Sequence, residues 1–383
     1  MAFALRPLLF KLHLYVAVAI SLYVAIMGFT GTIMAFEIEI SHLAHADVAY
    51  VAPGPTRLSL TELGKAVAKV YPGQKIGGYF LGEAPNLSTE VDVGDKSVYV
   101  DPYTGHILGT DSAWANRVDR TLGAIHSIHQ RLTSPRPGRA GATQAFMAWV
   151  TVAALFLLLS GIYLWWPRMR FGIGKGGGRA FWYDLHATLG IAAVIFMCLL
   201  AVTGIMLGFE RTTKPMLYAL SGSQPAPPPK APSPPSGNPI SLEQAFAIGG
   251  KALPGATPYE VVGPTTQGYF VLARTPGDHS TNGGRSRAII DAYSGAVLSA
   301  EELDTAPAGT RLIALNRSIH TGDIFGMPSK IVMALASLII FLQVVSGILM
   351  WVKRVPLRNK VPALAFAVAV AAIALYTIFA PTN

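Results

Sequence analysis

The chain has 383 residues, of which 51% are hydrophobic and 13% are charged, and its formal net charge is +9. This composition is typical of a membrane protein and argues against a soluble enzyme. The one cysteine, Cys198, excludes a disulfide within the chain and an iron–sulfur cluster held by cysteines.

Five stretches are long enough to cross a hydrocarbon core, which takes about 20 apolar residues. The first is too long for the core of a signal peptide, so we expect it to remain as a span. The chain is therefore predicted to be an α-helical integral membrane protein embedded in a lipid bilayer. The predicted spans are residues 12–36, 145–166, 182–209, 328–352 and 361–380.

Lysine and arginine predict the orientation of these spans. Segments 1–11, 167–181 and 353–360 contain basic residues and no acidic residue. The positive-inside rule places them in the cytoplasm, together with the N-terminus. The long segments 37–144 and 210–327 then lie in the periplasm if the membrane is a bacterial inner membrane. Since no basic face is concentrated on a folded domain, we expect no nucleic-acid partner.

Both long segments have the pattern of a short helix followed by strands, which predicts two small α+β domains. Helices are predicted at 59–73 and 241–255, and strands within 90–108 and 269–298. The predicted organisation is a first span (1–36), a first periplasmic domain (37–144), the second and third spans with a cytoplasmic loop (145–209, loop 167–181), a second periplasmic domain with a proline-rich linker (210–327, linker 223–239) and the fourth and fifth spans (328–383).

The two halves of the chain resemble each other. The stretch "LHLYVAVA…TGTIMAFE" within 12–37 matches "LHATLGIA…TGIMLGFE" within 185–210 without a gap, which aligns His13 with His186. The tripeptide "SIH" before the second span recurs before the fourth, which aligns His129 with His320. The sequence thus predicts a duplicated span–external domain–span unit, with a fifth span outside the duplication.

This duplication predicts two haem sites. Parallel repeats are related by an axis along the membrane normal, so equivalent residues lie at equal depth. If spans one and three share a diagonal of a four-helix bundle, His13 faces His186 near the cytoplasm, and His129 faces His320 on the outer side. Neutral imidazoles are good axial ligands of haem iron. We expect two non-covalently bound b-type haems, although the pairing of the ligands between diagonals stays open.

Other histidines offer alternatives. His126 lies one helical turn before His129, so it is a second candidate for the outer ligand or a partner of a haem propionate. His42 and His45 follow the first span and have no histidine counterparts in the second half. Arg131 and Arg317 lie closest to the outer histidines and are candidate propionate contacts.

Short motifs are spread over nearly the whole chain. They are "KLH" and "TG" within 11–31, "IHQRL" at 128–132, "SGIYLWWPR" at 160–168, "FWYDLHATLG" at 181–190 and "IHTGDIFG" at 319–326. In content and order these motifs resemble those of the PepSY-associated transmembrane family, and within it the FoxB-like ferric-siderophore reductases. The resemblance implies that the external domains are PepSY-like and that the haem ligands are His13, His129, His186 and His320.

The resemblance also implies an activity, a haem-dependent ferric-chelate reductase of the inner membrane that passes electrons outward to a ferric siderophore and releases its iron. The glycine-rich run "FGIGKGGGR" at 171–179 lies between two spans rather than in a βαβ unit, so it does not predict a site for NAD(P)H or flavin. Electrons are therefore expected from a quinol or a separate cytoplasmic donor.

Two other functions remain as alternatives. A siderophore permease would need polar residues in mid-membrane, whereas the spans contain mostly Ala, Val, Leu and Ile between the histidine levels. A non-enzymatic regulatory membrane protein would use its PepSY-like domains to bind partners. That alternative leaves the duplicated histidines without a role.

Overall fold

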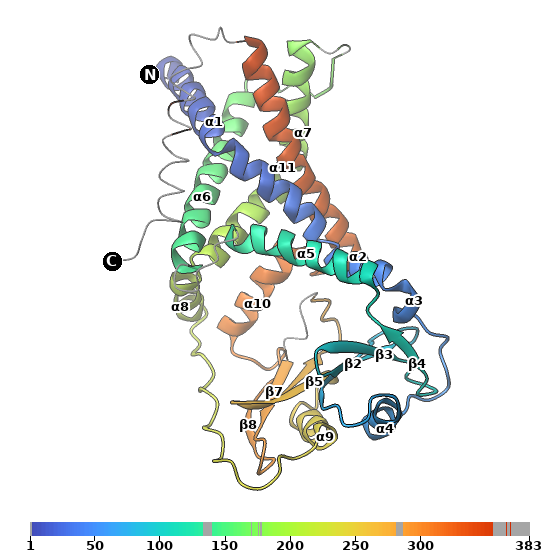
Figure 1. Cartoon of the computed structure of the whole chain (residues 1–383). Helices are drawn as coiled ribbons and strands as arrows, with labels where there is room; N and C mark the ends of the chain where they lie inside the picture. Colours follow the sequence, from blue (N-terminus) through green and yellow to red (C-terminus); the bar gives the residue numbers. More distant parts are fainter. Residues whose placement is uncertain are drawn as a thin grey trace. The chain divides into compact units, whose positions relative to one another are not determined.

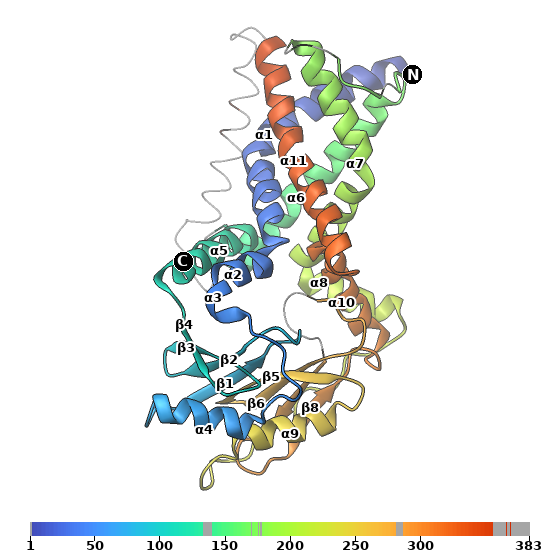
Figure 2. The ribbon, with the colours of Figure 1, turned by 90° about the vertical axis from the view of Figure 1, so that its right-hand side faces the viewer.

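The computed structural model describes residues 2–132, 140–169, 171–174, 176, 178–280, 286–354, 365 and 368. These residues form two compact units, each assembled from separate parts of the chain (Figures 1 and 2). The first unit gathers described residues of 1–36, 122–216 and 315–383. The second gathers those of 37–121 and 217–314.

Four long helices form the body of the first unit, and each is long and apolar enough to cross a membrane. Their positions coincide with the first four predicted spans. The fifth predicted span, 361–380, lies outside the described residues apart from 365 and 368. The four helices are α1 (Ala2–Met34), α6 (Ala140–Trp165), α7 (Arg179–Gly208) and α11 (Met327–Arg354).

The four helices pack in a ring, in the order α1, α6, α7, α11 and back to α1. Helices α1 and α7 therefore share one diagonal and α6 and α11 the other, as the sequence predicts. Glycines allow close approach between neighbours. A Cβ on Gly28 would lie 2.8 Å from the backbone nitrogen of Phe341, and one on Gly208 would lie 2.5 Å from the Cβ of Ala148. Small residues at such crossings are typical of helix packing in lipid.

The second unit is built on one antiparallel sheet of eight strands, in the order β4-β3-β2-β1-β5-β6-β7-β8. The first long segment supplies four consecutive strands and the second supplies the other four. The strands are β1 (Ile76–Leu81), β2 (Thr89–Val93), β3 (Lys96–Val100), β4 (Ile107–Thr110), β5 (Thr257–Thr265), β6 (Gly268–Arg274), β7 (Ser286–Ile290) and β8 (Val297–Glu301).

The two predicted external domains are not separate. Strand β1 pairs with β5, with Tyr79 opposite Val261. One hydrophobic core contains residues of both segments, including Leu63, Tyr79, Val261 and Val271. The prediction of two independent domains is corrected accordingly, because each segment supplies half of a single sheet and half of its core.

Two helices cover one face of this sheet, α4 (Leu60–Val70) and α9 (Leu242–Ala252) (Figure 2). Both begin with a capping box, made by Ser59 with Glu62 in α4 and by Ser241 with Gln244 in α9. Such a box satisfies backbone N–H groups at the start of a helix. These helices confirm the predictions at 59–73 and 241–255, and their apolar faces supply part of the core.

The packing of α9 on β6 depends on Gly249. A Cβ at this position would lie 2.6 Å from the Cβ of Val271, which is fully buried. Gly249→Val is therefore expected to lower the free energy of unfolding of the second unit by about 1–3 kcal/mol through overpacking. Urea unfolding of the full chain in detergent, followed through the β-sheet signal, measures this loss. Gly123→Ala is the control, because no heavy atom lies within 4 Å of its added Cβ. Equal losses in both variants would contradict the prediction.

The opposite face of the sheet carries carboxylates that alternate with core residues. Glu90 on β2 and Glu260 on β5 both pair with Phe80 of β1, and Asp92 lies two residues after Glu90. Burial, with the nearby negative charges of Asp92 and Glu90, raises the pKa of Glu260 to about 7. At neutral pH this carboxyl is therefore only partly ionised.

The raised pKa of Glu260 predicts a pH-dependent stability. Because the folded state holds this proton more tightly than the unfolded state does, stability should fall as the pH rises from 4.5, the ordinary pKa of glutamate, through about 7. Glu260→Gln is expected to raise the free energy of unfolding at pH 8 by on the order of 1 kcal/mol, reduced by solvent screening. The same substitution should change the free energy of unfolding little at pH 5. Asp95→Asn in the exposed β2–β3 turn is the control. A pH-independent effect of Glu260→Gln would contradict this account.

Five shorter helices belong to the described part of the chain. They are α2 (Glu37–Ala44), α3 (Ala46–Ala49), α5 (Ala113–Arg131), α8 (Glu210–Leu220) and α10 (Ala308–Thr321).

The proline-rich linker has no helix or strand. It is nevertheless bound to the second unit, because the backbone N–H of Lys230 donates to the carbonyl of Leu298 (3.0 Å) and that of Ser233 donates to Asp291 Oδ2 (2.6 Å).

Candidate functional site

The predicted inner histidines lie on the two helices that share a diagonal, His13 on α1 and His186 on α7. His13 Nδ1 lies 2.8 Å from Ser160 Oγ on α6. His186 Nδ1 lies 3.1 Å from Ser346 Oγ and 3.1 Å from the carbonyl oxygen of Gln343, both on α11. The two rings are close enough to interact electrostatically. The structure therefore brings this predicted pair together.

The predicted outer histidines are held in the same manner. His129 on α5 has its Nδ1 2.8 Å from Thr30 Oγ1 of α1, and His320 on α10 has its Nδ1 2.9 Å from Thr203 Oγ1 of α7. A proton on His320 would act electrostatically on His129, so this pair also lies within electrostatic range. Thr30 and Thr203 lie towards the ends of α1 and α7 opposite to His13 and His186.

The hydroxyl contacts favour a proton on Nδ1 of each ring. Each hydroxyl can donate its own hydrogen to a backbone carbonyl of its helix and accept from the histidine. Nδ1 is then the N–H of each ring, and Nε2 keeps its lone pair. The donated bonds run from Thr30 to Ile26 (2.7 Å), from Thr203 to Leu199 (2.6 Å), from Ser346 to Leu342 (2.7 Å) and from Ser160 to Leu157 (3.2 Å).

A glycine follows each of these four hydroxyl residues, and a histidine ring lies against it. A Cβ on Gly31 would lie 3.2 Å from His129 Cε1, and one on Gly204 would lie 3.2 Å from His320 Cε1. At the inner level the corresponding distances are 3.7 Å for Gly161 and 3.5 Å for Gly347. Four hydroxyl–glycine dipeptides thus each receive one ring, with the closest fit at the outer level.

Burial favours the neutral form of the two outer histidines. Burial lowers the pKa of His129 to about 3, and nearby positive charge on His320 and His126 adds to this effect. Burial also lowers the pKa of His320 to about 4. A neutral imidazole with a free Nε2 is the form that binds a metal ion. Both side chains nevertheless keep part of their surface accessible, so they are not fully packed core residues.

The structure also locates the secondary candidates. His126 lies on the same helix as His129 and close to it, but the contact with Thr30 and Gly31 is made by His129. Arg317 is exposed and close enough to His320 for its charge to contribute to the lowered pKa. Arg131 ends α5, and its side chain lies outside the described part of the chain.

These residues fit a haem better than a bare metal ion. In the part of the chain that the structure describes, no three His, Cys, Asp or Glu side chains gather in a group able to hold a metal ion. Paired imidazoles supply two ligands, the number that haem iron takes from a protein when its porphyrin supplies the other four. An Nδ1–H held by a hydroxyl orients the ring and raises the basicity of Nε2.

The hydroxyl and glycine residues are functional candidates that the sequence prediction did not single out. Their signal is nevertheless present, because "TG" occurs at 30–31 and 203–204 and "SG" at 160–161 and 346–347. Each dipeptide lies at equivalent positions of the two halves. The contact of each with a histidine appears only in the folded chain.

Comparison with models of known protein families gives a match. The sequence model of a family described as "PepSY-associated TM region" matches residues 10–354, a range that contains all four histidines. No curated protein matches the chain.

Proposed function

We propose, from the premise that this chain belongs to the PepSY-associated TM region family, that it is a dihaem b-type oxidoreductase of a membrane. The family match and the four apolar helices support a multi-pass membrane protein. The proposal goes further and assigns His13 and His186 to an inner haem and His129 and His320 to an outer haem.

One observation carries the proposal, the shared geometry of the four imidazoles. Each Nδ1 lies 2.8–3.1 Å from a serine or threonine hydroxyl, an arrangement that favours a proton on Nδ1 and a free lone pair on Nε2. One pair of rings lies near one end of α1 and α7, and the other pair lies near the opposite end of these two helices. His13 and Thr30 are separated by about 25 Å along α1 at 1.5 Å per residue, so the pairs mark two levels near opposite faces of a bilayer. A permease lined by histidines would not require this matched pairing.

The chain's own residues would perform defined tasks around bound haem. The hydroxyls orient the rings and hold a proton at Nδ1, and the apolar spans exclude water from the path between the two levels. Bound haem supplies one-electron transfer between ferric and ferrous iron. A neutral imidazole ligand adds no charge to the membrane interior, where charge is costly.

We propose a ferric siderophore in the periplasm as the substrate and the bacterial inner membrane as the location. Support comes from the motifs shared with FoxB-like reductases and from the basic short segments, which favour a cytoplasmic N-terminus and periplasmic long segments. Reduction of the iron lowers its affinity for chelators with hard oxygen ligands, because Fe(II) carries less charge than Fe(III). The electron donor would be a quinol or a separate cytoplasmic protein.

Absorbance spectroscopy of the purified chain in detergent tests the proposal. We expect a reduced b-type spectrum, about two haems per chain, and reoxidation of the reduced protein by a ferric siderophore. A folded but colourless protein would exclude the dihaem proposal. In that case, siderophore uptake by vesicles containing the chain would support a permease, and its absence a regulatory protein.

A further inference from the structure

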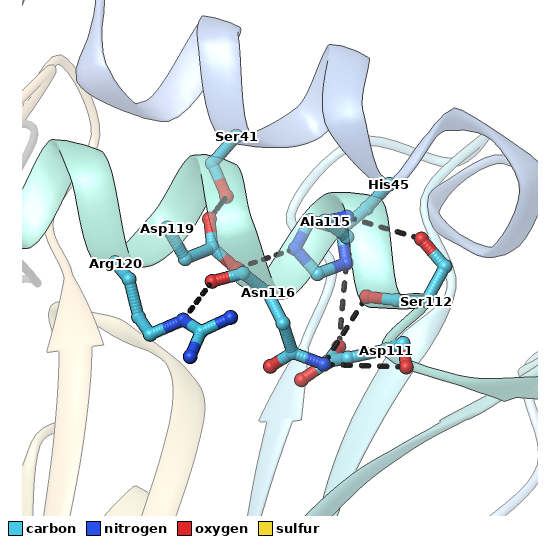
Figure 3. Close-up of polar contacts among 8 residues, drawn as sticks. All are labelled: Ser41, His45, Asp111, Ser112, Ala115, Asn116, Asp119 and Arg120. Carbon is cyan, nitrogen blue, oxygen red and sulfur yellow. Dashed lines mark hydrogen bonds and ion pairs between the residues drawn. The ribbon is translucent and has the colours of Figure 1, made fainter.

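Three side chains that the proposed function does not use meet in the second unit (Figure 3). His45, between α2 and α3, is only 4% exposed. Its Nε2 lies 2.7 Å from Asp119 Oδ2 on α5, and Ser41 of α2 donates a hydrogen bond of 2.9 Å to the other oxygen of Asp119. Its Nδ1 lies 3.3 Å from Asp111 Oδ1, just after β4. Each ring nitrogen of His45 therefore faces a carboxylate.

The two contacts differ in kind. Because the carboxylate of Asp119 only accepts, Nε2 is the N–H of the neutral ring, and Nδ1 then holds a lone pair. Nδ1 of His45 and Oδ1 of Asp111 are both buried, and neither has a hydrogen-bond partner among the residues that the structure describes. Two lone-pair atoms thus face each other inside the protein, where polar atoms need a partner. A cation bound between them would supply it.

The separation of these two atoms suits a metal ion. Divalent transition metals bind imidazole nitrogen and carboxylate oxygen at about 2.0–2.2 Å. Two ligand atoms that are 3.3 Å apart then subtend about 105° at the ion, close to the angle of a tetrahedron. In the described part of the chain no third His, Cys, Asp or Glu completes a metal-binding group, so water would supply the remaining ligands.

The surroundings of the pair also favour a cation. The bond from Nε2 to Asp119 is the carboxylate–histidine arrangement that orients a metal-binding imidazole. Burial, with the negative charges of Asp92 and Asp111, raises the pKa of Glu90 on β2, which also interacts electrostatically with His45. Negative charge therefore gathers around the orphaned nitrogen.

The second half of the chain shows that the fold does not need this histidine. The alignment that places Glu37 on Glu210 places His45 on Tyr218, and the alignment of His129 with His320 places Asp119 on Thr310. Tyr218 Oη lies 2.9 Å from Thr310 Oγ1. A neutral pair thus makes the equivalent link between the segment after a span and the next helix.

We propose that His45 Nδ1 and Asp111 Oδ1 bind a divalent first-row transition-metal ion, with Asp119 as a positioning residue. A mixed nitrogen and oxygen pair favours such ions over Ca²⁺ and Mg²⁺, which prefer oxygen ligands alone. With two protein ligands the ion exchanges readily, which suits an ion in transit rather than a permanent structural metal. Fe(II) belongs to this class, and on its supply alone the inference rests on the proposed function, whose reaction would release it.

Equilibrium dialysis of the full chain in detergent against Zn(II), followed by elemental analysis, tests the site. His45→Gln and Asp111→Asn are each expected to bind about one Zn(II) per chain fewer than the unaltered protein, because each removes one of the two ligands. Asp119→Ala removes the acceptor of the Nε2–H and should lower the affinity for Zn(II) by about 10–100-fold. An excess of Ca²⁺ should not displace the zinc.

Matched variants separate a specific site from general binding. His106→Gln and Asp95→Asn replace exposed residues of the same unit and should leave zinc binding unchanged. Size-exclusion chromatography checks the fold of each variant, and Asp111→Asn decides the question if His45→Gln does not fold.

Equal zinc binding by the unaltered chain and a folded Asp111→Asn would overturn the proposal and leave His45 as a partner in an ordinary ion pair. The difference between variants is measured whether or not haem is bound. A colourless protein that keeps this difference would exclude the proposed function and retain the metal site, whereas a haem protein without the difference would do the reverse.

Discussion

Replacing His186 with alanine is expected to remove about half of the haem from the purified chain, because it deletes one of the two axial ligands of the inner site. The outer pair is held by separate residues about 25 Å away along α1 and should keep its haem. His320→Ala is expected to remove the other half, and the double variant both haems. Absorbance of the extracted haem, divided by protein concentration, measures the content.

Exposed histidines provide the control for this experiment. His106 and His279 lie at the surface of the second unit, so their replacement by alanine should leave the haem content unchanged. Size-exclusion chromatography of each variant separates loss of a ligand from loss of the fold. Full haem content in well-folded His186→Ala and His320→Ala would show that these residues are not ligands.

Thr30→Val is expected to weaken haem binding at the outer site by about 10–100-fold, the usual cost of losing the group that orients a metal-binding histidine. Valine has nearly the shape of threonine but leaves the Nδ1–H of His129 without its acceptor. Thr30→Ser keeps the hydroxyl and should restore most of the affinity. Transfer of haem to an excess of an apo-haem protein measures the difference, and the midpoint potential of the outer haem should shift with it.

The same helix offers a matched control two residues further on. The hydroxyl of Thr32 donates to the carbonyl of Gly28 at 2.8 Å and also lies 3.5 Å from that of Ala334, whereas the hydroxyl of Thr30 bonds its own helix and His129. Thr32→Val removes a hydroxyl from the same span and should leave haem transfer unchanged. The role given to Thr30 would be wrong if both variants released haem equally fast.

The sequence predicts the helical framework well, because each signal is local or repeated. Twenty apolar residues specify a span wherever they occur, and the repeat aligns His13 with His186 at equal depth. The structure places these two residues on one diagonal, as that alignment requires. The choice of His129 over His126 also follows the repeat, and the Thr30 contact favours it.

The shared sheet was not predictable in the same way. Alternation along β1 or β5 is the same whether the strand lies at an edge or at the centre of a sheet. The pairing of Tyr79 with Val261 joins segments that are separated by two spans, and no local pattern encodes it. The hydroxyl contacts escaped prediction because a threonine in a span commonly bonds its own helix. His45 lacks a histidine counterpart, so the repeat gave no reason to single it out.

The pairing of β1 with β5 also constrains how the chain folds during its synthesis. Its two strands are separated in the sequence by α6 and α7, so neither edge can be covered until both helices have entered the membrane and the later segment has been synthesised. During that interval β1 presents an open row of backbone donors and acceptors, the feature through which nascent chains aggregate. Assembly of this protein therefore includes a waiting period, in which half of the sheet has formed and its open edge has no partner strand.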